Sequence, residues 1–262
     1  MTKPTSDVID ALAQRLHSGR QMGTAIDYLE QLATEHDGYA VQKALHRKFL
    51  QDGQEIGGWK VAASTAAQYG PLGLTRPAVG GVLAKNIVRS GTLMPMTRFV
   101  KPGIECEVAL RVGPAIGAAK YPVTQDEACG WIAAAVPCFE IIDNRYARLA
   151  GMNGAARIAD DFLQAACVLG SEVLDWRGLN FGRLAGTLSV DGTQLASCAA
   201  DPAFDALGAF AFAANLLAEQ NMPLKEGDVV LTGALHKPHF LDRPGQYSFD
   251  LPSLGSVSVR FE

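Results

Sequence analysis

The sequence lacks the features that mark nucleic-acid-binding, membrane-spanning and disulfide-stabilised proteins. Its 23 Lys and Arg against 27 Asp and Glu give a net charge of −4, without a dense basic run. That balance argues against nucleic acid as a partner. No stretch approaches the roughly 20 consecutive apolar residues of a membrane span. The 5 cysteines are scattered and form no C-x-x-C pair, so neither a disulfide framework nor a common zinc site is indicated.

Two common nucleotide-binding patterns are also absent. The sequence contains neither G-x-G-x-x-G nor a P-loop, so nucleotide binding has no support. Residues 1–16 are polar and charged, without the apolar run of a signal peptide. Cysteines that stay reduced are typical of the cytoplasm. We therefore expect a cytoplasmic protein that acts on a small molecule and uses neither nucleic acid nor a membrane.

The length of 262 residues suits one large domain with a smaller appendage. Apolar periodicity predicts helices throughout residues 6–51, and the first begins near Ser6. The second carries Ile26, Leu29 and Leu32 and is expected to end at Gly38. We therefore divide the chain into an N-terminal helical section, residues 1–55, and a main domain, residues 56–262.

Two carboxylates stand out in the strand-like segment Ile104–Leu110. Glu105 and Glu107 are two residues apart, so in a strand they share one face, with Cα atoms roughly 7 Å apart. A divalent cation between them would turn their repulsion into attraction, and oxygen ligands suit Mg²⁺ or Mn²⁺ better than zinc. The alternative is an exposed polar face of an edge strand.

Two further charged residues lie within apolar strand-like runs. Glu140 is flanked by Phe139 and Ile141, where a carboxylate is costly to bury unless a cation or hydrogen bonds satisfy it. Lys60 follows Gly57-Gly58-Trp59, and its side chain either reaches solvent or serves a site.

The remaining pattern mixes helices and strands. A capping box at Thr124 predicts a helix that carries Trp131 and stops at Pro137. Another helix is expected from Asp201 to about Gln220. Strands of mixed spacing around these two helices favour an α+β fold over an alternating βαβ sheet.

Several short segments match those of one known family in their order and spacing along the chain. They are Gly58–Val61, Ile104–Ala109, Glu140–Arg145, Ala159-Asp160, Ala214-Asn215, Gly227–Gly233 and Leu254–Val259. Taken together, they resemble the fumarylacetoacetate hydrolase superfamily, in particular its branch of 2-keto-4-pentenoate hydratases and 4-oxalocrotonate decarboxylases. The resemblance extends over nearly the whole chain.

The resemblance implies an α+β fold with a mixed β-roll core, which makes residues 56–262 the catalytic domain behind the helical section. It implies a bound Mg²⁺ or Mn²⁺. The residues it assigns are Glu105, Glu107 and Glu140 to the metal, Lys60 to catalysis, and Asp160, Thr232 and Gly233 to substrate binding.

The implied activity is that of a metal-dependent hydratase, a lyase of aromatic-compound catabolism. It would add water to a 2-hydroxy-2,4-dienoate, or 2-keto-4-enoate, to give a 4-hydroxy-2-oxo acid. The metal would bind the 2-oxo acid as a Lewis acid, and Lys60, with its pKa lowered by the cation and by burial, would shuttle protons. A decarboxylase of the 4-oxalocrotonate type, a C–C hydrolase and a catalytically silent metal-binding partner subunit remain alternatives.

The resemblance also implies a homo-oligomer and is compatible with a complex with a decarboxylase or aldolase of the same pathway. Four residues depart from the family pattern. Ala78 stands where we expect an acid, Phe162 and Leu163 replace the usual small and hydroxyl residues, and Ala234 stands where a serine is common. We therefore expect a more apolar pocket or a different substrate.

Overall fold

The computed structural model describes residues 4–26, 32–117 and 120–262. The α-helices are α1 (Ser6–Met22), α2 (Glu35–Gln51), α3 (Ala66–Tyr69), α4 (Gln125–Ala128), α5 (Gly154–Ala159) and α6 (Ala206–Glu219). The strands are β1 (Ile56–Ala62), β2 (Ala78–Leu83), β3 (Ile87–Arg89), β4 (Thr92–Met94), β5 (Pro102–Val112), β6 (Ile132–Asp143), β7 (Gln164–Leu169), β8 (Ala185–Val190), β9 (Thr193–Ala199), β10 (Val229–Ala234), β11 (His239–Phe240), β12 (Gly245–Leu251) and β13 (Gly255–Phe261).

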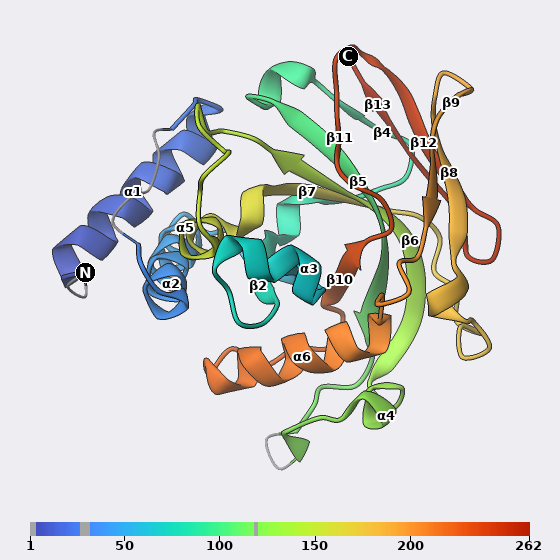
Figure 1. Cartoon of the computed structure of the whole chain (residues 1–262), viewed down its shortest axis with the longest axis horizontal. Helices are drawn as coiled ribbons and strands as arrows, with labels where there is room; N and C mark the ends of the chain where they lie inside the picture. Colours follow the sequence, from blue (N-terminus) through green and yellow to red (C-terminus); the bar gives the residue numbers. More distant parts are fainter. Residues whose placement is uncertain (1–3, 27–31, 118–119) are drawn as a thin grey trace.

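The strands form two sheets that lie next to each other (Figure 1). The larger sheet has the order β2-β1-β10-β5-β6-β7-β3, with β11 paired to β5, and the smaller has the order β4-β13-β12-β8-β9. β1 pairs in parallel with β10, and β3 with β7, while the other pairs within the larger sheet are antiparallel. The predicted α+β class with a mixed sheet core is therefore confirmed.

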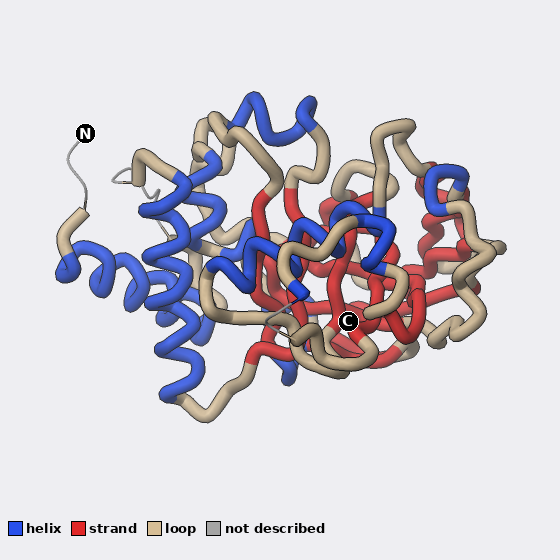
Figure 2. Tube along the Cα trace, turned by 90° about the horizontal axis from the view of Figure 1, so that it is seen from below, coloured by secondary structure: helices blue, strands red, loops and turns tan. Residues whose placement is uncertain are grey.

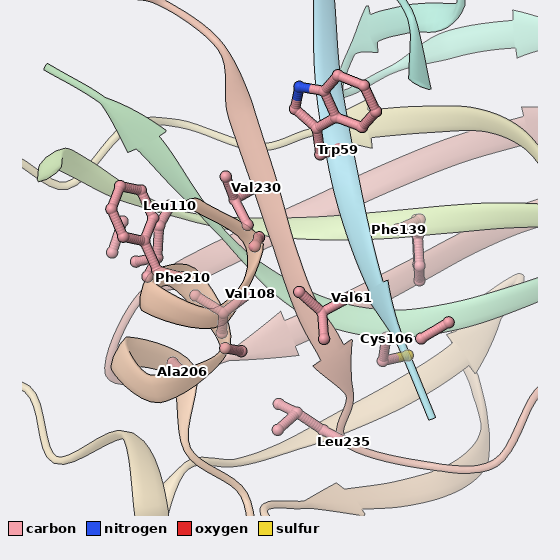
Figure 3. Packing of buried hydrophobic residues seen from close by; sticks show 14 of the residues in the cluster. Trp59, Val61, Cys106, Val108, Leu110, Phe139, Ala206, Phe210, Val230 and Leu235 are labelled. Carbon is pink, nitrogen blue, oxygen red and sulfur yellow. The ribbon is translucent and has the colours of Figure 1, made fainter. Parts of the chain in front are cut away.

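One face of the larger sheet carries the main hydrophobic core. Trp59, Val61, Val108 and Val230 point to this face and belong to a cluster that also includes side chains of α6 and of the smaller sheet. Figure 3 shows Phe210 of α6 beside the strand residues of this cluster. Because side chains alternate along a strand, the residues between these apolar ones point to the opposite face.

The N-terminal helices cover that opposite side. α1 and α2 pack on each other and α2 packs on α5, and their buried side chains form a second cluster with Leu83, Ile142 and Leu163. In Figure 2 these helices gather at one end of the molecule, beside the strands. The division at residue 55 stays a prediction, since the helical section and the sheet share this cluster.

The helix expected to carry Ile26, Leu29 and Leu32 is absent at Ile26 and at Leu32, the two of these residues that the structure describes. Ile26 forms an isolated bridge with Tyr146 and donates its backbone N–H to Arg145, while Leu29 lies outside the described residues. Gly38 lies inside α2, because a capping box between Thr34 and Asp37 starts that helix at Glu35.

Glycine is required at position 38 for packing rather than for helix termination. A Cβ there would lie 2.5 Å from the carbonyl oxygen of Ala155. The close approach of α2 to α5 therefore depends on the absent side chain.

Two other helix boundaries also differ from expectation. The capping box at Thr124 is present, but its helix ends at Ala128 and the segment through Pro137 belongs to strand β6. That apolar run pairs with β5 and is buried except at Ala133, so sheet pairing overrides the helical pattern. α6 begins at Ala206 with Asp205 as its N-cap, later than the expected start at Asp201. None of the helices in the described ranges is both long and apolar enough to cross a membrane.

Candidate active site

Strand register places three carboxylates on one face of the larger sheet. Glu105 and Glu107 are both on β5, and Glu140 on β6 lies directly opposite Glu105 in the antiparallel pair. Directly opposed residues of such a pair share a face. This face is opposite the main core, because the neighbouring Cys106 and Val108 belong to that core. Glu105, Glu107 and Glu140, hereafter the glutamate cluster, therefore project together.

The glutamate cluster is closely spaced and largely buried. Each residue offers one carboxylate oxygen, and these oxygens lie within 4.8 Å of one another. Glu140 is fully buried at 0% exposure and Glu107 is 2% exposed, while Glu105 is partly exposed. Since isolated buried carboxylates are strongly disfavoured, nearby cations or bound protons must neutralise the group.

Lys60 supplies one positive charge from a more distant strand of the same sheet. It pairs in register with Leu231 of β10, which pairs with Ala109 of β5, so Lys60 shares the face of Glu105 and Glu107. Its Nζ lies 2.9 Å from Oε1 of Glu140, and its side chain is buried. The structure thus brings Lys60 together with the glutamate cluster, and the solvent-facing alternative is wrong.

A strand irregularity anchors Glu107. The register between β10 and β5 shifts between Leu231 and Ala234, and Gly233 in this bulge donates its backbone N–H to Oε2 of Glu107 at 3.0 Å. Gly233 has a φ of 111°, and a Cβ there would lie 2.8 Å from Oγ of Ser64. Both features favour glycine at this position.

The charges in the site shift one another's protonation. Burial raises the pKa of Glu140, Lys60 opposes this rise and Glu105 adds to it. The net pKa of Glu140 is about 8. Burial and the charges of Glu140 and Glu105 raise the pKa of Glu107 well above its ordinary range. The metal-free cluster therefore holds protons that a bound cation would displace.

The pKa of Lys60 moves in the direction opposite to our expectation for the metal-bound site. Burial alone would lower it, but the negative charges of Glu140, Glu105 and Glu107 raise it in the metal-free protein. Lys60 is therefore an ammonium ion here. A bound dication would neutralise the carboxylates that hold this proton.

The residues present fit a hard divalent cation. When ionised, three carboxylates and one ammonium leave two negative charges in a buried space, which one divalent cation balances. Within the described ranges, Oε2 of Glu140 accepts no hydrogen bond although the residue is fully buried. A carboxylate-only donor set suits Mg²⁺ or Mn²⁺ rather than zinc or copper.

A small cavity of about 180 Å³ opens beside Glu105, Glu107 and Lys60. We call it the site pocket. Its polar lining includes Ser64, Gln68, Arg157 and Gly233, and its apolar lining includes Ile142, Leu149, Phe162, Leu163, Ala234, Pro238 and Phe240. Arg157, Ser64 and Gln68 were missed by the sequence analysis, because none of them stands in a pattern that distinguishes it from ordinary surface residues.

One wall of the site pocket is a left-handed turn. Asp161, Phe162 and Leu163 have φ values of 48°, 52° and 69°, an uncommon conformation for three consecutive residues other than glycine. The turn places the Phe162 ring centroid 5.7 Å from Nζ of Lys60. Oδ1 of Asp161 accepts hydrogen bonds from Gly81 and His46, which hold the turn from below.

Of the three residues expected to bind substrate, only Gly233 lines the site pocket. Thr232 is buried, and its Oγ1 donates to the carbonyl oxygen of Val108 at 2.8 Å. Asp160 is fully buried in an ion-pair network with Arg20 and Arg145, both at 2.8 Å. The structure does not bring Asp160 or Thr232 into the pocket, so their contact with substrate stays a prediction.

The four departures from the family pattern have different positions. Phe162, Leu163 and Ala234 line the site pocket, as expected for a more apolar cavity. Ala78 is buried at the end of β2 and does not line the pocket.

Comparison with known proteins gives consistent matches over the whole chain. The sequence is 30% identical to the 2-keto-4-pentenoate hydratase of Burkholderia vietnamiensis (strain G4 / LMG 22486), over 97% of this chain and 97% of that protein. It is 29% identical to the 2-keto-4-pentenoate hydratase of Paraburkholderia phymatum, again over 97% of each chain. No family model matches the sequence.

Solved structures match the same fold. The 4-oxalocrotonate decarboxylase from Pseudomonas putida G7, complexed with magnesium and adipate, aligns with a TM-score of 0.91 and 21% identity over 100% of both chains. The fumarylpyruvate hydrolase from Pseudomonas aeruginosa, in complex with Mn²⁺ and pyruvate, aligns with a TM-score of 0.57 and 17% identity over 78% of this chain and 88% of that one. At these identities the likeness is one of fold.

Proposed function

Because this chain belongs to the 2-keto-4-pentenoate hydratase family of the fumarylacetoacetate hydrolase superfamily, we propose that it is a hydro-lyase acting on a 2-oxo acid. The reaction adds a proton and a hydroxide to an unsaturated chain, converting a 2-hydroxy-2,4-dienoate into a 4-hydroxy-2-oxo acid. The observation that carries the proposal is the buried glutamate cluster with Lys60 at 2.9 Å from Glu140.

The glutamate cluster would hold the metal, Mg²⁺ or Mn²⁺. When bound, such an ion supplies Lewis-acid stabilisation to the negative charge that develops on the 2-oxo oxygen. Glu107 is the best positioned of the three carboxylates, since the N–H of Gly233 fixes one of its oxygens. Glu140 is held in turn by Lys60.

Lys60 would hold and move the proton. Its Nζ is buried at the pocket wall, between Glu140 and the ring of Phe162. The carboxylates keep this nitrogen protonated in the metal-free protein, and their neutralisation on metal binding would make the proton easier to release. Lys60 can then act first as an acid and afterwards as a base toward a substrate carbon or water.

The apolar wall would set the water content of the pocket. Phe162 and Leu163 cover the side next to Lys60, while Pro238 and Phe240 line another part of the cavity. Such a wall limits how many waters reach the reacting atoms and strengthens the electrostatic interactions within the site. The cavity of about 180 Å³ accommodates a short-chain acid.

The experiment is turnover of 2-hydroxypenta-2,4-dienoate and of 4-oxalocrotonate with Mg²⁺ or Mn²⁺, each repeated with a chelator. Loss of the dienoate without release of CO₂, abolished by chelator, is the expected result. Release of CO₂ from 4-oxalocrotonate would instead assign the decarboxylase, whose fold this chain shares at a TM-score of 0.91. Absence of turnover on a panel of 2-oxo acids would contradict any catalytic role and favour the silent metal-binding subunit.

Metal binding by the glutamate cluster is tested separately with Glu107→Gln. The amide keeps the size of the side chain but removes its charge, so we expect Mg²⁺ and Mn²⁺ affinity measured by calorimetry to fall by at least about tenfold. Glu226→Gln, which changes an exposed carboxylate away from the pocket, is the control and should leave affinity unchanged. Equal affinity in Glu107→Gln and the wild-type protein would rule out the metal assignment.

We also propose that the chain assembles with copies of itself and works in the cytoplasm. Large apolar side chains such as Met22, Leu50 and Leu174 are 67%, 54% and 68% exposed, and a contact between copies would remove such side chains from water. All five cysteines carry free thiols, which supports a reducing compartment. A complex with a decarboxylase or aldolase remains a further proposal, and size-exclusion chromatography with light scattering tests the assembly.

A further inference from the structure

A second, larger cavity lies apart from the site pocket. It has a volume of about 450 Å³ and is lined by the C-terminal end of α1, by the loops around Asn86 and Arg98, and by Arg145 and Gln164. No residue lines both this cavity and the site pocket. We call it the polar cavity, because most of its lining side chains are charged or amide groups.

Buried hydrogen-bonding groups in its lining lack protein partners. Arg145 is 3% exposed, and its terminal nitrogens contact Asp143 and Asp160, yet its Nε–H has no acceptor among the described residues. Gln164 is 1% exposed, and the described residues offer no acceptor to its Nε2. A buried donor left without a partner destabilises the fold, so these groups favour an acceptor inside the cavity.

Two further cations in the lining are not balanced by carboxylates. Lys85 and Arg98 are exposed, and neither forms an ion pair with any residue in the described ranges. Arg98 contacts only neutral groups in this region, since its NH2 donates to Asn86 and its guanidinium lies 5.5 Å from the ring centroid of Phe99. Their charge therefore remains available to a negatively charged ligand.

The one acid in the lining is already satisfied. Asp143 accepts hydrogen bonds from the backbone N–H groups of Val100 and Lys101, and its Oδ2 lies 3.7 Å from Arg145. Arg20 is likewise neutralised by Asp160 and Asp161 behind the cavity wall. The remaining potential of the cavity is positive, and it comes from Lys85 and Arg98.

We propose that the polar cavity binds a small organic anion through a carboxylate or phosphate group. Arg145 Nε and Gln164 Nε2 donate to its oxygens, and the charges of Lys85 and Arg98 attract it. The buried Oε1 of Gln54, which no described donor reaches, accepts from a hydroxyl or N–H of the same ligand. A volume of about 450 Å³ falls within the range of small-molecule sites, roughly 300–1,000 Å³.

This site is distinct from the proposed catalytic one, although residues that are neighbours along the chain line the two cavities. Phe162 and Leu163 line the site pocket, whereas the next two residues, Gln164 and Ala165, line the polar cavity. The binding proposal holds whichever 2-oxo acid the enzyme converts, and its test needs no turnover.

The test is calorimetric titration of the full chain with inorganic phosphate and with adipate, both in excess chelator. Excess chelator keeps metal out of the glutamate cluster, so neither probe can bind in the site pocket through a metal ion. We expect saturable binding of at least one probe, weakened by about tenfold or more in Lys85→Gln/Arg98→Gln, since a charge-assisted hydrogen bond contributes about 1.5–3 kcal/mol. Arg89→Gln/Arg183→Gln removes the same charge from exposed positions outside the cavity and should bind like the wild-type protein.

A substitution of a buried lining residue tests whether the ligand binds inside the polar cavity. Gln164→Met keeps a similar volume and removes the orphan donor, so it should weaken the same probe while thermal unfolding checks that the fold is intact. Absence of saturable binding of both probes below about 10 mM would overturn the proposal and leave a cavity filled with water. Equal weakening in the Arg89→Gln/Arg183→Gln control would overturn it as well, because binding would then follow net charge alone.

Discussion

In the proposed mechanism, the chemistry of the site pocket depends on Lys60. Its ammonium group is buried, lies 2.9 Å from Glu140 and faces the ring of Phe162 at 5.7 Å. In the metal-free protein, the surrounding carboxylates outweigh burial and raise its pKa. The same nitrogen thus balances part of the charge of the glutamate cluster, and it lines the site pocket together with Glu105 and Glu107, where we propose that it exchanges a proton with substrate.

Lys60→Met should separate these two roles. Methionine keeps much of the apolar length of the side chain but cannot carry a proton, so we expect kcat to fall by about 10²–10⁴-fold. Metal binding should persist, because the glutamate cluster is retained. Steady-state kinetics with saturating Mg²⁺ and calorimetry of the same sample provide the two measurements.

The matched control is Lys60→Arg, which keeps the charge but not an ammonium that releases its proton readily. It should bind metal and remain slow. A Lys60→Met variant with wild-type kcat would remove Lys60 from catalysis.

The elements of the site differ in how far the sequence could predict them. Glu105 and Glu107 were predictable as one face of a strand, since their spacing alone requires it. The position of Glu140 opposite Glu105 depends on the register between β5 and β6, to which only the family resemblance pointed. The strand β6 itself was partly mistaken for a helix, because residues 132–137 are apolar on both faces and give no period-two pattern.

Asp160 is a residue whose structural partners could not be predicted from the sequence around it. Its place in a family segment suggested contact with substrate. In the structure, the Asp160 carboxylate forms one ion pair with Arg20 of α1 and another with Arg145. These partners are far apart in the sequence, so no local pattern announces the pairing. The left-handed turn that follows was equally hidden, since it contains no glycine and is held by Gly81 and His46 from distant elements.

The role of this turn can be tested by a substitution in β2, which contacts it. A Cβ added at Gly80 would lie 2.8 Å from the carbonyl oxygen and 3.0 Å from Cα of Asp161, both backbone atoms. Gly80→Ala should therefore destabilise the protein by about 1–3 kcal/mol in urea unfolding. It should also lower kcat, because the displaced turn carries Phe162 away from Lys60.

Gly70→Ala is the control for this substitution. Gly70 has a φ of −55°, and a Cβ there meets nothing within 4 Å. Its stability and kcat should stay close to wild-type values. If Gly80→Ala unfolds like this control and keeps its kcat, the contact between β2 and the turn does not position the pocket wall.

At the scale of the whole molecule, the two faces of the larger sheet have different tasks. One face packs against α6 and the smaller sheet through an apolar cluster, while the other bears the glutamate cluster and Lys60 under the N-terminal helices and the left-handed turn. The apolar face stabilises a sheet whose other face carries mutually repelling carboxylates. The stability of the fold should therefore depend on pH and on bound metal more than the modest formal charge of the chain suggests.

We expect metal to stabilise the protein increasingly as the pH rises. Burial raises the pKa of Glu140 from its ordinary 4.5 to about 8 in the metal-free fold. Between these values the native state binds more protons than the unfolded chain, so the free energy of unfolding falls as pH rises through this window.

Excess Mg²⁺ should raise the melting temperature by about 5 °C or more at a hundredfold excess over Kd, with a larger gain at pH 8 than at pH 5.5. Thermal unfolding across this pH range, with chelator or with Mg²⁺, measures how stability depends on pH in the metal-free and the metal-bound protein. Glu140→Gln should weaken the pH dependence of the metal-free protein. Identical pH slopes for the chelated wild-type protein and Glu140→Gln would contradict the assignment, because the pH dependence would then arise from groups other than Glu140.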